Sequence, residues 1–69
     1  MATDKIYIVT LRKREDLEGF YADMASDGYK LSAKRPISRN THYFMEEEDA
    51  VEIRKDSRVI ACELSHIHI

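Results

Sequence analysis

The C-terminal segment of the sequence contains the residues best suited to metal chemistry. His66 and His68 are two positions apart, so their imidazole rings would lie on the same side of an extended strand. Imidazole nitrogens bind metal ions, but a closed zinc site needs about four ligands, and His42 is the sole other histidine. The segment Ser65–Ile69 is therefore a metal-ligand pair, an exposed tail, or an extended peptide that docks in the groove of a partner. We favour the docking peptide and expect no metal ion.

A nucleophile is the second chemical possibility, and Cys62 is the residue that would supply it. It alternates with Ile60 and Leu64 along an apolar segment, whereas a reactive thiol needs a base and an electropositive, accessible setting. We therefore predict that Cys62 is a small buried hydrophobic residue. The sequence contains no glycine-rich phosphate loop and no Ser/His/Asp spacing. These patterns predict a protein that is not an enzyme and that needs no cofactor.

Basic and aromatic residues raise the question of RNA binding. Basic residues occur at positions 12–14, 35 and 39, and Tyr7, Tyr43 and Phe44 fall in neighbouring β-type segments. Stacking aromatic rings beside basic side chains are typical of RNA-recognition domains. However, the second aromatic segment leads into four acidic residues instead of the basic and glycine residues of the RNA-binding octamer. The net charge at pH 7 is −2, so we expect no nucleic-acid partner.

The length and composition of the chain limit the architecture that positions these side chains. Its 69 residues form at most one domain, 1–69, and a content of 43% hydrophobic and 35% charged residues suits a small globular fold. A chain of this length buries only about 60% of the surface that its unfolded form exposes. No segment approaches the roughly 20 apolar residues of a membrane span, and no signal peptide is recognised, so we expect a cytoplasmic product without a membrane partner. A small core without a disulfide or a metal predicts dependence on a partner protein.

Hydrophobic periodicity predicts the secondary structure. Strands are predicted at 5–12, 29–34, 41–45 and 58–64, with a loop at 35–40. A helix is predicted at 15–27, because apolar residues recur at i, i+3, i+4 and i+7 from Leu17, and Gly28 follows in a position to end it. The acidic run Glu46–Asp49 is typical of the first turn of a second, short helix rather than of a cation site.

The order of these elements, β-α-β-β-α-β, predicts an α+β fold of the ferredoxin-like type. This fold is a four-stranded antiparallel sheet with two helices on one face. Because the segments 5–12 and 58–64 are apolar on both sides, we expect the first and last strands at the centre. The expected strand order is third, first, fourth, second. The face without helices is then left for solvent or for a partner.

The whole chain resembles the propeptide, or inhibitor, domain of subtilisin-like serine proteases. The segment 7–11 is similar to the first strand of that family, and Gly28 stands where those propeptides have a glycine before the second strand. Residues 50–51, followed by 54–63, look like the family's closing pattern of a short helix and a last strand, with Ser57 in place of the usual proline. The resemblance covers about residues 6 to 69.

This resemblance implies a mode of binding. Propeptides of the family pack the open face of the sheet against two helices of the protease, and their C-terminal residues lie in the active-site cleft like a product. Glu63 matches the acidic residue that caps the N-termini of the protease helices, consistent with the attraction of anions to such ends. Ser65–Ile69 would be the strand that occupies the cleft. The implied function is inhibition or folding assistance of a subtilisin-like protease.

A second, more local resemblance points to a different setting. Residues 35–43, the acidic helix start and residues 54–59 are similar to the N-terminal domain of structural proteins from tailed phages of marine cyanobacteria. In such proteins the fold would attach one virion component to another, and the protein would reside in the virion. Arg35 and Arg39 would then be partner contacts, or they would brace their turn through carboxylates.

We therefore predict a non-catalytic protein-binding module that docks through its open sheet face and its C-terminal strand. The expected partner is a subtilisin-like protease, and the alternative partner is a set of virion structural proteins. The predicted partner-binding residues are Arg35, Arg39, Glu63, Ser65, His66, Ile67, His68 and Ile69.

Overall fold

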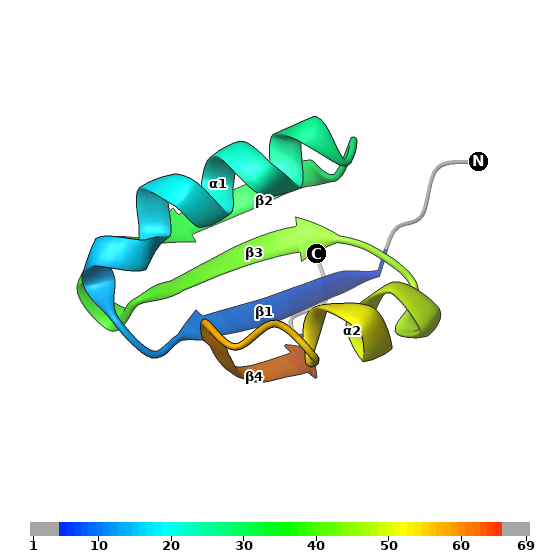
Figure 1. The fold of residues 1–69 in the computed structure, drawn as a ribbon. Coiled ribbons are helices and arrows are strands. Elements are labelled where there is room, and N and C mark those ends of the chain that lie inside the picture. Colours follow the sequence, from blue (N-terminus) through cyan, green and yellow to red (C-terminus); the bar gives the residue numbers. More distant parts are fainter. Residues whose placement is uncertain (1–4, 66–69) are drawn as a thin grey trace.

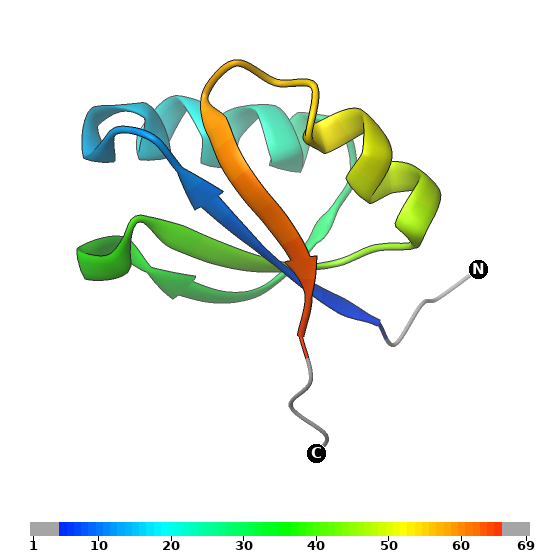
Figure 2. The same ribbon diagram turned by 90° about the horizontal axis from the view of Figure 1, so that it is seen from below.

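Residues 5–65 are described by the computed structural model of the protein, and they form one antiparallel sheet with two α-helices. In chain order the elements are β1 (Ile6–Leu11), the 3-10 helix η1 (Arg14–Asp16), α1 (Leu17–Ser26), β2 (Lys30–Arg35), the 3-10 helix η2 (Pro36–Ser38), β3 (Asn40–Phe44), α2 (Glu47–Ile53) and β4 (Val59–Leu64). Both α-helices lie on the same side of the sheet, as Figures 1 and 2 show. The expected α+β architecture, with a four-stranded antiparallel sheet and two helices, is confirmed. No helix within residues 5–65 is long and apolar enough to cross a membrane.

The strand order is β2-β3-β1-β4, and it corrects the expected order. The prediction of a central β1 is confirmed, but β4 lies at an edge and β3 is the second central strand. The apolar residues on both sides of β4 misled the prediction, because Ile60 and Leu64 are 48% and 43% exposed. Strand β3 carries Asn40 and His42 on its second side, yet a central strand needs only one apolar side when the sheet has an open face.

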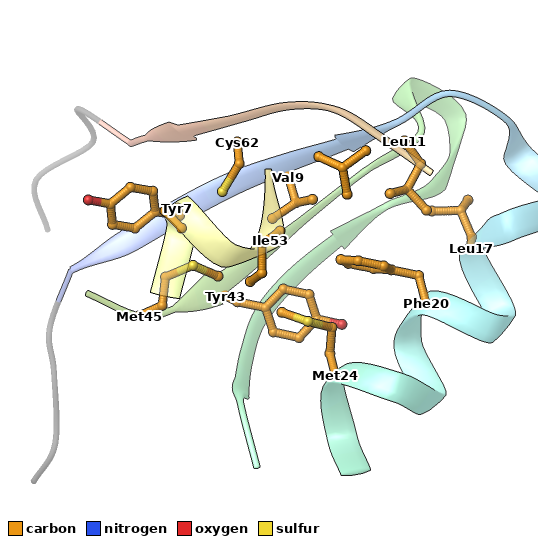
Figure 3. Close-up of a cluster of buried hydrophobic side chains, with 12 residues drawn as sticks. Tyr7, Val9, Leu11, Leu17, Phe20, Met24, Tyr43, Met45, Ile53 and Cys62 are labelled. Carbon is orange, nitrogen blue, oxygen red and sulfur yellow. The ribbon is translucent and has the colours of Figure 1, made fainter. Parts of the chain in front are cut away.

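The hydrophobic core lies between the sheet and the helices (Figure 3). Burial alternates strictly along β1, as the side-chain period of a strand requires. Every second residue enters the core, and the intervening residues are half-buried. Helix α1 adds residues spaced by three and four positions, and α2 adds two more. The core residues of β1, α1 and α2 are Tyr7, Val9, Leu11, Leu17, Phe20, Met24, Ala50 and Ile53.

Both helices have defined ends. Gly28 ends α1 with φ of 87°, and the N–H groups of Gly28 and Tyr29 donate to the carbonyl oxygens of Ala25 and Met24 at 3.1 Å each. This left-handed glycine cap confirms the expected end of the helix. At the start of α2, the N–H of Glu46 donates to Oδ2 of Asp49 at 3.1 Å. The acidic run is therefore part of a helix cap, as predicted.

Candidate protein-binding surface

The face of the sheet opposite the helices presents a half-buried central strip from β1 and β3. Its residues lie opposite one another in the antiparallel register, so their side chains share one face. We call these six residues the central strip: Ile6, Ile8, Thr10, Asn40, His42 and Phe44. Ala33 of β2, opposite His42, and Ala61 of β4, opposite Thr10, extend the strip to both sides. Three branched or aromatic apolar side chains, Ile6, Ile8 and Phe44, thereby share one face of the sheet. Neither α-helix of residues 5–65 lies on that face (Figure 2).

Opposite charges flank the central strip. On the β2 side, Lys30 pairs with Phe44 and Arg35 pairs with Asn40, so both side chains belong to the open face. On the β4 side, Glu63 pairs with Ile8. All three charged residues are exposed. The open face is therefore apolar in the middle, positive along β2 and negative along β4.

Two contacts shape the positive side of this face. The Nζ of Lys30 lies 5.5 Å from the centroid of the Phe44 ring, which places a cation over the aromatic face. Partial burial, together with the nearby charge of Arg35, lowers the pKa of His42 below its ordinary value. His42 is consequently neutral at physiological pH, and the middle of the face carries no charge.

The outer edge of β4 is covered in part by a side chain of the loop after α2. The N–H of Ser65 donates to the carbonyl of Ile6 at 2.8 Å. Because hydrogen-bonded and non-hydrogen-bonded pairs alternate along an antiparallel ladder, Cys62, three residues earlier, points its backbone N–H and C=O groups away from β1. The carbonyl of Cys62 accepts a hydrogen bond of 2.9 Å from Nε of Arg54. A capped carbonyl makes this edge less available for pairing with another strand.

Arg54 also belongs to a small polar network that joins α2 to the sheet. Its Nη1 lies 2.7 Å from Oε2 of Glu47, and the hydroxyl of Tyr7 donates to Oε1 of Glu47 at 2.8 Å. The Arg54 guanidinium and the Tyr7 hydroxyl lower the pKa of Glu47, and the same carboxylate raises the pKa of Tyr7. The network therefore fastens the start of α2 to β1 and its end to β4.

Cys62 is only 2% exposed, and burial raises the pKa of its thiol to about 11. It is therefore protonated at neutral pH and packs as a small hydrophobic group, as predicted. Within residues 5–65, no group of three or more His, Cys, Asp or Glu side chains is placed to hold a metal ion.

The two predicted arginine contacts differ in their surroundings. Arg39 has φ of 58°, and its Nε donates to the carbonyl of Leu11 at 3.3 Å while its own carbonyl accepts from the Leu11 N–H at 2.8 Å. It therefore braces the β2–β3 hairpin against β1 through a backbone carbonyl. Arg35 is exposed beside the central strip. Between them, at the hairpin tip, Ile37 is 86% exposed.

The predicted C-terminal contacts are described only in part. Glu63 is exposed on the open face, and Ser65 continues the ladder with β1 through the hydrogen bond to Ile6. The other four predicted contacts, His66, Ile67, His68 and Ile69, lie outside the described residues.

Sequence reasoning missed part of this surface, and the structure shows which of the three aromatic rings lies on it. Tyr7 and Tyr43 are 3% and 2% exposed and point into the core, so they provide no stacking surface for bases. Phe44 alone of these three rings lies on the open face. Lys30 was not singled out, although its position one residue before Leu31 in an alternating strand is a signal that could have placed it there.

Comparison of the chain with protein-family models, with curated proteins and with solved structures found no match.

Proposed function

We propose that the chain is a non-catalytic protein-binding module that docks on a partner protein through the open face of its sheet. The observation that carries this proposal is the central strip, in which the half-buried Ile6, Ile8 and Phe44 share the face without helices, between oppositely charged margins. Covering such a surface removes apolar area from water, while the charged margins orient the partner. In keeping with the resemblance to protease propeptides, the proposed partner is a subtilisin-like protease, and the proposed role is inhibition or folding assistance.

We also infer that the fold is of the ferredoxin-like class. The connection through α1 joins β1 and β2 with β3 between them, and the connection through α2 joins β3 and β4 with β1 between them. Two interleaved crossovers of this kind are what a split β-α-β arrangement requires. In this class the helices occupy one face, which supports docking by the other.

Glu63 supports the proposed mode of docking. Its carboxylate is exposed on the open face, in the same cross-strand row as Ile8 and His42. A carboxylate in this position is suited to the N-terminus of a partner helix, where unpaired N–H groups and the helix dipole attract an anion.

An inhibition assay tests this function. The intact chain is expected to inhibit a subtilisin-type protease, and truncation after Leu64 is expected to abolish inhibition because it removes the proposed cleft strand. Ile8→Glu is expected to weaken inhibition strongly, because it places a charge in the central strip. Val51→Glu is the matched control, since Val51 is 44% exposed on α2, away from the open face. Absence of inhibition by the intact chain, at concentrations where it is folded by circular dichroism, removes the protease from the proposal.

The alternative function, attachment within a tailed-phage particle, is supported by the hairpin tip. Ile37 is 86% exposed between two arginines, and Arg39 fixes the conformation of the tip against β1. A rigid, protruding apolar side chain suits a second contact, separate from the open face. This alternative predicts that the protein co-purifies with phage particles and that Ile37→Asp releases it. Its absence from purified particles contradicts the alternative.

A further inference from the structure

We propose that the open face of the sheet also binds the open face of a second copy of this chain, giving a two-fold symmetric dimer of stacked sheets. The inference shares one premise with the proposed function, namely that the open face is a binding surface, and it names a further partner for it. The arrangement of charge on the face selects one symmetry operation and one alignment of the two sheets.

The charged margins decide the direction of the two-fold axis. Lys30 and Arg35 lie along β2, at one edge of the sheet, and Glu63 lies along β4, at the other. An axis parallel to the strands places β2 of each copy over β4 of the other, so the positive margin meets the negative margin twice. An axis across the strands would place β2 over β2 and bring like charges together. An isologous interface therefore favours the first arrangement.

Residues that are paired across neighbouring strands form rows, and the position of these rows decides which charges of the two copies come within reach of each other. Glu63 lies in the row of Ile8 and His42. Lys30 lies in the row of Phe44, and Arg35 in the row of Asn40, one row to either side. Successive cross-strand rows on one face are about 6.7 Å apart, because side chains on the same face of a strand are two positions apart in sequence. Glu63 of one copy would therefore face the space between Lys30 and Arg35 of the other, within the span of both long side chains.

The same operation places the apolar residues opposite one another. Strand β3 of each copy lies over β1 of the other, because these two strands are the central ones. His42 would face Ile8 of the second copy, and Phe44 would face Ile6. His42 is uncharged at physiological pH, so its burial between the sheets brings no unpaired charge. Stacked sheets of this kind pack about 10 Å apart, with their strands nearly aligned.

Sedimentation velocity tests the dimer on the intact chain without any protease. A face of four short strands is at the small end of stable interfaces, so the measurement covers about 5 to about 500 micromolar protein. We expect the mass to rise from monomer to dimer over this range. Glu63→Lys alone, and Lys30→Glu with Arg35→Glu, are each expected to weaken association at least tenfold, because like charges then meet at both margins. Glu48→Lys, on the exposed side of α2, is the matched control and is expected to leave association unchanged.

Mixing the two charge variants tests most directly whether the opposite margins of two copies meet. In a mixed dimer, Lys at position 63 of one copy meets Glu at positions 30 and 35 of the other, and the second margin keeps its native charges. The mixture is therefore expected to regain native association, while each variant alone still associates at least tenfold more weakly than the native chain. All three positions are exposed, and circular dichroism checks that each variant is folded.

Several results would overturn the dimer. These are a monomer throughout the concentration range, charge variants that associate as well as the native chain, or a mixture that fails to associate. A dimer that does not inhibit a protease leaves the symmetric interface standing and removes the proposed protease. A monomer that inhibits a protease removes the symmetric interface and leaves the proposed protease standing, so the two failures are distinguishable.

Discussion

The two faces of the sheet use similar residues for different purposes. Along β1, Val9 and Leu11 are 0% exposed beneath the helices, whereas Ile6 and Ile8 are half-buried on the opposite face. The side chains are equally apolar, so composition does not explain the difference. It follows from the two crossovers, which place both helices on one side (Figure 2). The covered face holds the fold together, and the open face leaves part of its apolar area unburied.

The charges of the molecule follow the same division. On the covered side, Arg58 bridges the elements, with ion pairs of 2.9 Å to Asp23 of α1 and 2.7 Å to Asp56. It also lies 5.3 Å from the centroid of the Phe20 ring. On the open face, the three charged side chains lie at the margins, opposite apolar or neutral residues of the neighbouring strand. The charges on the covered side therefore join elements of the fold, whereas those on the open face lie exposed at its margins.

The largest effect is expected from Phe20→Ala, which removes the ring that fills the covered face. Phe20 is 1% exposed and contacts Tyr43 edge-to-face, with ring centroids 6.2 Å apart. Its truncation is expected to lower the free energy of unfolding by about 3–5 kcal/mol, which is most of the stability of a domain this small. Urea denaturation followed by circular dichroism measures the change. A loss below about 1 kcal/mol would show that the helices contribute little to the core.

A matched pair on neighbouring residues of β1 compares the two faces directly. Val9→Ala is expected to lower the free energy of unfolding by about 2 kcal/mol, because it leaves a cavity under the helices. Ile8→Ala, which removes more carbon atoms from the open face, is expected to cost less than about 1 kcal/mol in the monomer. Denaturation at low protein concentration, where no dimer forms, gives both values. Equal losses would mean that the open face is as much a part of the core as the covered face.

The smallest effect concerns pH and the covered side. Hydrogen bonds from the Arg58 guanidinium lower the pKa of Asp56 below its ordinary value. A carboxylate with a lowered pKa stabilises the fold above its unfolded pKa of about 3.9, and this contribution is lost as the pH falls through the folded value. The native chain is therefore expected to lose stability below about pH 4, and Asp56→Asn is expected to flatten this dependence. Thermal unfolding between about pH 2 and about pH 7 measures it, with Glu48→Gln as an exposed carboxylate control.

Local patterns were sufficient to predict most of the elements. The spacing of Leu17, Phe20 and Met24 predicted a helix, and Gly28 predicted its end, because both signals depend on residues within a few positions of one another. The start of the helix was less well predicted, since its first turn, Arg14–Asp16, is a 3-10 helix. Helix termini are decided by weak local hydrogen bonds, and several geometries compete there.

The candidate site was predictable only in outline. An open sheet face and an exposed Glu63 follow from element order and alternation. The role of Arg39 did not, because its bond to Leu11 joins residues far apart in the chain. The β-bulge after Leu31 also escaped prediction, although it keeps both Lys30 and Arg35 on the open face.

The sequence by itself determined the kinds and order of the elements and the buried state of Cys62. These properties rest on composition and on short-range periodicity. The tertiary structure alone decided that β3 rather than β4 is central, and that positive and negative margins face each other across the central strip. Strand order depends on how two crossovers interleave, and no local pattern specifies this. An apolar strand such as β4 can lie at an edge of the sheet, because a bulge and the side chain of Arg54 protect its outer side from pairing with another strand.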